Sequence, residues 1–294
     1  MTEARPTPID PIDRWRQIVV ARREQHDAAC AQQGRTTDDY WSRRAEGYSK
    51  FAERSAAGGD PFLECVLRYL RPEDTVLDVG AGTGRHALSL ARHARQVTAL
   101  DPSPAMLRFL KEGAASRGLS NVEVIEGAWP DAVDRAPPAD IVLSAHVLYP
   151  IEDIVPFLRA LDGHARRYCF LYLMVLQPWF DQIGLWEAVH GQPRRPQPTH
   201  IDVVNVLHQL GCYANVEVAS AETPHMFDSI EDAIDRFAES LAVRDDPERL
   251  GKLRKALEER LESLPDGGLA LPQRRYPQAT VWWEAGALRA EPFG

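Results

Sequence analysis

Residues 76–107 read VLDVGAGTGRHALSLARHARQVTALDPSPAML, and this stretch decides the fold. An apolar run comes first, followed by three glycines in five residues, a helical segment, a second apolar run and then Asp101. A buried strand that enters a glycine-rich turn and a helix, with another strand after it, is typical of a βαβ unit. The stretch therefore predicts two parallel strands joined by a helix.

The same alternation of strand and helix continues along the chain. Apolar runs of strand length occupy 75–79, 96–100, 122–126, 139–144 and 167–176. Helical patterns lie between them at 83–94, 103–117 and 150–162. Strands that are apolar along nearly their whole length are typical of a sheet covered on both faces. We therefore expect an α/β fold with a doubly wound, mostly parallel sheet.

Composition excludes several classes of protein. The formal net charge of −9 disfavours a polyanion such as nucleic acid as the partner. No apolar run reaches the roughly 20 residues of a membrane helix, and the first 15 residues lack the apolar core of a signal peptide, so we expect a cytoplasmic protein. The four cysteines have no CxxC spacing, and no metal site is expected.

The glycine loop and the acid after the second strand point to a cofactor. Gly80, Ala81, Gly82 and Gly84 permit a tight turn and let a ligand approach bare backbone at the start of a helix. Asp101 follows 21 residues after Gly80, where a carboxylate can accept hydrogen bonds from both hydroxyls of a ribose. A cofactor that contains a nucleoside is therefore expected.

The identity of that cofactor depends on the details of the loop. The spacing is G-x-G-x-G, whereas the dinucleotide fingerprint is G-x-G-x-x-G, and position 85 is an arginine. Asp78 stands two residues before the first glycine, where its charge would repel a pyrophosphate. That acid instead suits a ligand with an ammonium group and a sulfonium.

At this point Asp78–Gly84 resembles the first motif of the class I S-adenosylmethionine-dependent methyltransferases, and Asp101 resembles their ribose-binding acid. The resemblance covers residues 60–222 and the strand ATVWWEA near the end. It implies a Rossmann-like, seven-stranded sheet, S-adenosylmethionine as cofactor and S-adenosylhomocysteine as product. It does not identify the methyl acceptor.

The resemblance also implies a domain organisation. Besides the core, helical patterns occur at 10–30, 38–57 and 200–210 and, as two amphipathic helices, within 229–264. We expect an N-terminal helical cap (1–60), a cofactor-binding core (61–222) with a loop insertion (177–198), a helical insertion (223–275), and a last core strand with a tail (276–294). The helical insertion either roofs the pocket or forms a homodimer surface.

Further site residues follow from the resemblance. Pro102, Ser103 and Met106 follow the ribose acid, where the adenine face is covered. Relatives often place an aspartate after the third strand, but this chain has Gly127, Ala128 and Trp129, so the Ala128 backbone and the Trp129 indole would cover the adenine instead. The segment from Ser144 to Tyr149 would lie beside the methionine part of the cofactor, and Tyr40 and Tyr48 are expected lid contacts.

His146 and Tyr149 are the expected contacts to the acceptor. His146 would titrate near neutrality and accept a proton if the acceptor is a hydroxyl; otherwise it would only orient the acceptor. The loop insertion offers an apolar wall of Trp179, Phe180 and Trp186, and Arg194 and Arg195 to meet an anionic acceptor.

Structural roles compete with these assignments. The glycines could serve only packing, Asp101 could only cap a helix, and Trp129 could only pack in the core. The leading function is a methyltransferase for a small molecule. The alternatives are a methyltransferase for RNA or protein, a protein that binds S-adenosylmethionine without catalysis, and a nicotinamide oxidoreductase.

Overall fold

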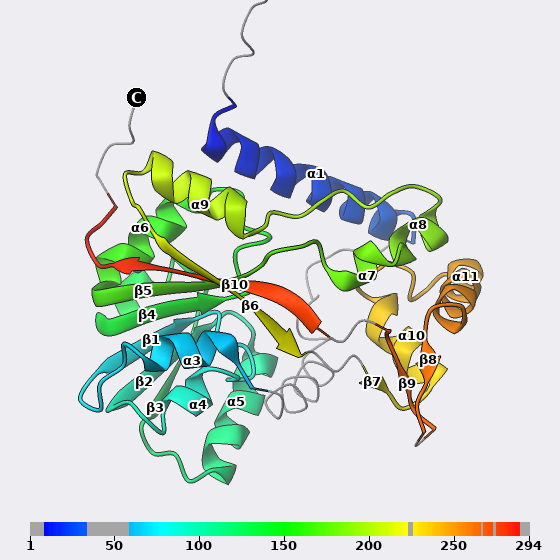
Figure 1. Ribbon diagram of the computed structural model, residues 1–294. Helices are drawn as coiled ribbons and strands as arrows, with labels where there is room; N and C mark the ends of the chain where they lie inside the picture. The colour runs from blue at the N-terminus through cyan, green and yellow to red at the C-terminus, as the bar shows by residue number, and fades with distance from the viewer. Residues whose placement is uncertain (1–8, 34–58, 223–225, 266, 273–274, 289–294) are drawn as a thin grey trace, which may run out of the picture.

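The computed structural model describes residues 9–33, 59–222, 226–265, 267–272 and 275–288. A seven-stranded sheet forms its centre (Figure 1). From one edge to the other, its strands are β3 (Val122–Glu126), β2 (Gln96–Asp101), β1 (Thr75–Val79), β4 (Ala139–Ala145), β5 (Ala165–Met174), β10 (Arg275–Glu284) and β6 (Asn215–Glu222). Neighbours from β3 to β5 pair in parallel, and β10 is antiparallel to both β5 and β6. The predicted doubly wound, mostly parallel, seven-stranded α/β fold is confirmed.

Helices cover both faces of this sheet. One face packs against α1 (Pro11–Ala31), α6 (Ile154–His164) and α9 (His200–Gln209), and the other against α3 (Pro61–Leu67), α4 (Ala87–Leu90) and α5 (Pro104–Ser116). Leu171 of β5 belongs to the core cluster of Trp15 and Phe157, whereas its neighbour Phe170 belongs to the cluster of Phe62. Successive strand residues point to opposite faces, so both faces need apolar side chains. This explains the continuous apolar runs in the sequence.

The helix after the glycine loop is shorter than the expected 83–94. Gly82 and Gly84 have φ values of +55° and +89°, which lie outside the helical region. The Gly84 N–H accordingly closes a turn on the Ala81 carbonyl, and α4 begins only at Ala87. After Leu90 the chain continues in turns, one of them closed by the His93 N–H on the Leu90 carbonyl. Glycine conformation therefore shortens a segment whose apolar spacing is helical.

A smaller body, which we term the helical unit, is built from two separate parts of the chain. It comprises α7 (Trp179–Gln182), α8 (Leu185–His190), α10 (Ile230–Ala238), α11 (Pro247–Glu258) and a three-stranded sheet of β7 (Met226–Phe227), β9 (Leu269–Ala270) and β8 (Glu262–Ser263). Trp186, Phe237 and Leu253 share its core. The expected loop at 177–198 thus contains two short helices. Strands of two residues are too short for a recognisable sequence period, so the small sheet could not be predicted.

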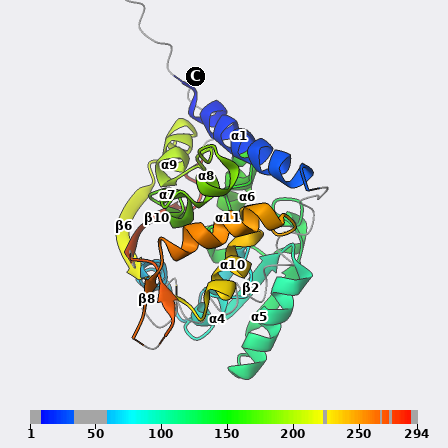
Figure 2. The same cartoon turned by 90° about the vertical axis from the view of Figure 1, so that its right-hand side faces the viewer.

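The helical unit stands on the side of the sheet to which the parallel strands point (Figures 1 and 2). Helix α1 connects it to the core. The Arg22 guanidinium contacts the Asp181 carboxylate of α7 at 2.8 Å, and both side chains are largely buried. The side-chain amide of Gln33, just after α1, donates to the carbonyl of Ala242. Among the described helices, none is both long enough and apolar enough to span a bilayer.

Candidate cofactor and acceptor site

The glycine loop folds from the end of β1 over the end of β2. The N–H groups of Gly80 and Ala81 donate to the Leu100 carbonyl at 2.7 and 3.0 Å. The N–H of Gly82 donates to Oδ2 of Asp101 at 2.8 Å. The structure therefore brings together the loop and the acid that lie 21 residues apart in sequence.

Two of the loop positions require glycine for different reasons. Gly80 has a φ of +77°, and a Cβ there would collide with the side chain of Val147, which follows β4. Gly84 has a φ of +89°, and a Cβ there would lie 2.8 Å from Leu110 Cγ and 2.9 Å from Leu88 Cγ. Gly84 therefore serves helix packing, which is the alternative role considered for the glycines above. Gly80 instead lets the segment after β4 approach the loop.

Two carboxylates lie at this point, at the ends of neighbouring strands. Asp101 is 8% exposed and accepts the N–H groups of Gly82 and Ser103. Burial raises its pKa, and these two bonds offset part of the effect. Asp78 is 2% exposed, and burial, reinforced by repulsion from Asp101, raises its pKa to about 7. Neither carboxylate has an ion pair within the part of the chain that the structure describes.

The negative charge of Asp78 and Asp101 limits which cofactor the site can hold. A pyrophosphate would meet two buried acids, which is unfavourable inside a protein. A ligand with a sulfonium and an ammonium group has the complementary charge, and ribose hydroxyls can donate to a carboxylate. The residues present therefore fit S-adenosylmethionine and do not fit a nicotinamide dinucleotide.

The residues expected around the adenine lie near Asp101. Gly127 donates its N–H to the Asp101 carbonyl at 3.0 Å, which places the exposed residue Ala128 beside Asp101. Pro102 is also exposed, and Met106 is buried in the first turn of α5. Ala128, Pro102 and Met106 therefore remain candidates for the adenine site.

The Trp129 indole is turned into the core instead. It is 8% exposed, its Nε1 donates to the Phe157 carbonyl at 3.3 Å, and its ring meets His164 edge-on. The interpretation that it covers the adenine is corrected, because the indole packs against α6. The side chain of Ser144 also makes a structural contact, because its hydroxyl donates to the Val79 carbonyl at 2.9 Å and joins β4 to β1.

His146 and Tyr149 are brought together just beyond the end of β4. The Tyr149 hydroxyl lies 2.9 Å from Nδ1 of His146 and accepts the N–H of Met174, also at 2.9 Å. His146 has a φ of +60°, and its N–H donates to the Tyr172 carbonyl of β5. Burial lowers the pKa of its imidazole to about 3, with repulsion from Arg85 as a second cause. The expectation that His146 titrates near neutrality is therefore wrong.

A buried ionic cluster beside this pair was missed by sequence reasoning. Asp60 caps α3 by accepting the N–H groups of Phe62 and Leu63 through Oδ1. Its Oδ2 contacts Arg85 Nη2 at 2.9 Å and His86 Nε2 at 3.2 Å. Burial would raise the pKa of Asp60, but the bond from His86 and the nearby positive charges outweigh it and lower that pKa. Only the Asp-Pro pair at the start of α3 signalled a cap.

The remaining candidates do not gather at the sheet edge or cannot be placed. Trp186 is 1% exposed inside the helical unit, with the Arg194 guanidinium 3.5 Å from its ring centroid, so its indole does not form the expected wall. Arg195 uses its backbone to bind α1, through bonds with Arg22 and Gln25. Tyr40 and Tyr48 lie outside the described residues, and the side chains of Trp179 and Phe180 are not described.

Comparison with known proteins indicates a methyltransferase domain in the core of the chain. Residues 76–166 match the model of a methyltransferase domain. An uncharacterized protein of Haemophilus influenzae is 27% identical over 84% of this chain and 90% of its own length. A protein-L-isoaspartate O-methyltransferase of Methanoregula boonei is 39% identical over 28% of this chain, and the match spans only 40% of that relative.

Among solved structures, a magnesium protoporphyrin IX methyltransferase of Synechocystis PCC 6803 with bound S-adenosylhomocysteine is similar at 15% identity. The match covers 82% of this chain and 84% of that one, with a TM-score of 0.46. The domain match at 76–166, the strand order and the acids around the glycine loop together indicate a methyltransferase that uses S-adenosylmethionine. The chain therefore carries a methyltransferase domain, matched over residues 76–166, on a Rossmann-like seven-stranded sheet.

Proposed function

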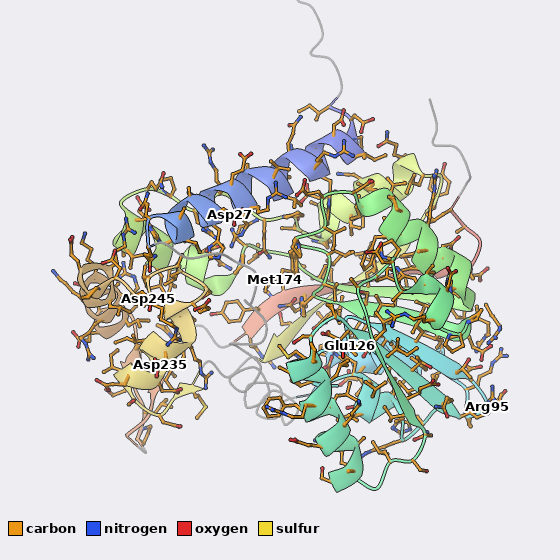
Figure 3. All side chains as sticks on the ribbon, turned by 180° about the vertical axis from the view of Figure 1, so that it is seen from behind. Asp27, Arg95, Glu126, Met174, Asp235 and Asp245 are labelled. Carbon is orange, nitrogen blue, oxygen red and sulfur yellow. The ribbon has the colours of Figure 1, made fainter. Side chains whose placement is uncertain are left out.

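We propose that this methyltransferase acts on a small-molecule acceptor bound at the ends of β4 and β5. The observation that carries the proposal is the helical unit, which stands opposite this edge of the sheet. Figure 3 shows Met174 and Glu126 at the edge, with Asp235 and Asp245 of the helical unit across from them. An acceptor bound at this edge would face the helical unit. The net charge of −9 also disfavours RNA as the acceptor.

The chain's own residues would bind and orient the reactants. When bound, S-adenosylmethionine supplies a methyl group already activated by a sulfonium. Asp101 would hold the ribose and Asp78 would face the positive part of the cofactor. The methyl group would pass to a lone pair of the acceptor while the sulfur keeps the electron pair of the broken bond, and any acceptor proton would leave to water. Such positioning contributes up to about 7–11 kcal/mol to lowering a barrier.

His146 and Tyr149 would orient the acceptor and would not remove its proton. A base with a pKa of about 3 has little affinity for a proton at neutral pH. Its Nδ1 is also engaged with Tyr149. The acceptor is therefore expected to be nucleophilic without a protein base.

The acceptor class can be tested with a methyl-labelled cofactor. The protein would be incubated separately with the small-molecule, RNA and protein fractions of a bacterial extract. Label should appear in the small-molecule fraction, and less of it should appear there with the Asp101→Ala variant at the same cofactor concentration. Label that enters RNA or protein would contradict the proposal, and so would binding of the cofactor without transfer to any fraction.

Cofactor binding is tested independently by calorimetry. Asp101→Ala should weaken S-adenosylmethionine about 10-fold or more, since hydrogen bonds from a charged group to hydroxyls are worth about 1.5–3 kcal/mol. Glu126→Gln is the matched control, because Glu126 pairs with Asp101 across β2 and β3 but is exposed. An unchanged dissociation constant for Asp101→Ala would remove Asp101 from the site.

A further inference from the structure

The hydroxyl of Tyr172 is buried in the core of the sheet. The residue is 1% exposed, and its Oη has no hydrogen-bond partner in the portion of the chain that the structure describes. Buried phenol hydroxyls usually have a partner, because desolvating one without compensation costs free energy. An orphaned hydroxyl at a strand end therefore points to a ligand.

The position of Tyr172 is at the edge where the acceptor is expected. It lies opposite Ala145, the last residue of β4, and its carbonyl accepts the N–H of His146. Strand β1, which leads into the glycine loop, is the neighbour of β4 on the other side. With strands about 4.8 Å apart, Tyr172 is about 10 Å from the end of β1. Ligands of open α/β sheets bind outside these strand ends.

A second orphaned polar atom lies on the same face of the sheet. Oε1 of Gln278 on β10 is buried and also lacks a partner among the described residues. Gln278 pairs with Met174, and Tyr172 pairs with Thr280, so Gln278 and Tyr172 are diagonal neighbours on adjacent strands. Such neighbours are about 7–8 Å apart. The Tyr172 hydroxyl and the Gln278 amide oxygen are therefore close enough to contact the same ligand.

The ring that carries the hydroxyl packs among other rings. The Tyr172 ring stacks on Phe62 at 4.8 Å and 18°, lies 4.8 Å from the His146 ring, and meets His86 edge-on. Burial raises the pKa of Tyr172, so the phenol keeps its proton. Asp60, whose charge acts on Tyr172, is paired with Arg85. Such a surface favours an uncharged, planar ligand.

We propose that the Tyr172 hydroxyl binds the methyl acceptor, and that this acceptor is an uncharged ring compound with a hydroxyl or ring nitrogen. Tyr172 donates to the acceptor's heteroatom, and Gln278 accepts from a second polar group. This inference rests on the proposed small-molecule function and adds the chemical class of the acceptor and the residue that selects it.

The first test needs no acceptor. Tyr172→Phe removes the orphaned hydroxyl and should raise the melting temperature of the cofactor-free protein by about 2 °C or more. Tyr168→Phe is the matched control, because Tyr168 lies on the same face of β5 and its ring packs against Tyr69 and Phe170. A lower melting temperature for Tyr172→Phe would show a structural role for the hydroxyl and overturn the inference.

The second test uses phenol as the probe, with benzoate and benzylammonium as charged counterparts. Their binding to the complex with S-adenosylhomocysteine would be measured by ligand-observed NMR. Phenol should bind more tightly than either ion, and Tyr172→Phe should weaken phenol about 2- to 10-fold while calorimetry shows S-adenosylhomocysteine unchanged. Absent or unaltered phenol binding, preference for an ion, or weakened S-adenosylhomocysteine in the variant would each overturn the inference. Failure of the wild-type protein to bind S-adenosylhomocysteine would instead contradict cofactor use itself.

Discussion

Replacing Asp60 by alanine should destabilise the protein far more than loss of an ordinary helix cap. The carboxylate is 10% exposed and performs two tasks: Oδ1 caps α3, and Oδ2 pairs with Arg85, whose side chain is 16% exposed. Loss of a cap costs about 1 kcal/mol, and removing one partner of a buried pair costs about 3–5 kcal/mol. Because Arg85 keeps some contact with water, we take the lower end and expect about 4 kcal/mol in total.

Two further variants separate these tasks. Asp60→Asn keeps a good cap but loses the charge, so it should cost about 3 kcal/mol. Asp246→Ala removes the cap of α11, where the carboxylate accepts the Arg249 N–H at 3.0 Å, and should cost about 1 kcal/mol. The free energy of unfolding would be obtained from urea titrations followed by tryptophan fluorescence. Equal losses for Asp60→Ala and Asp246→Ala would refute the reasoning, because the buried pair would then contribute nothing.

The pH dependence of the unfolding free energy tests the charge of the same residue. The folded-state pKa of Asp60 is lowered below its ordinary value of 3.8, so its stabilisation is present above that value and lost as the pH falls further. The difference in unfolding free energy between the wild type and Asp60→Asn should therefore stay constant above about pH 4 and shrink below it. A difference that grows on acidification would contradict the ion pair.

Three more outcomes are expected. The folded-state pKa of Asp78 is raised from 3.8 to about 7, so ionisation of this carboxylate destabilises the cofactor-free protein increasingly between these pH values. The unfolding free energy of Asp78→Asn, measured by urea titration, should therefore exceed that of the wild type by an amount that grows with pH over this window and stays constant above it. His146, with a pKa of about 3, should show the nitrogen chemical shifts of a neutral imidazole down to about pH 5, and a midpoint near 6.5 would contradict its burial. Gly80→Ala should lower the unfolding midpoint by the equivalent of about 1–3 kcal/mol through strain and collision with Val147, whereas Gly163→Ala in α6, where a Cβ meets open space, should be neutral or slightly stabilising; equal effects would dismiss the Gly80 constraint.

The sequence predicted what depends on local patterns. The cofactor loop was readable because glycines, Asp78 and Asp101 act within 24 residues of chain, and the strands were readable because both faces of the sheet are buried. The order of the strands was not predicted, since no local pattern states that β10 inserts between β5 and β6.

Contacts between distant segments could not be predicted. Asp60 and Arg85 are 25 positions apart and belong to different elements. Tyr172 is recognised as a candidate site only because its hydroxyl has no partner among the described residues. The low pKa of His146 likewise results from burial by several elements. Trp129 was misinterpreted because the sequence cannot say toward which side of the sheet an indole turns.

The place of β10 has a consequence for the order in which the sheet can form. Its strand is synthesised after every other strand of the large sheet, yet it lies between β5 and β6. Until it emerges from the ribosome, β5 has an unpaired edge and β6 has no hydrogen-bonded neighbour. A nascent chain that ends within the helical unit should therefore already contain the cofactor strands but leave β5 exposed to aggregation, and a chaperone that shields strand edges would act at this stage.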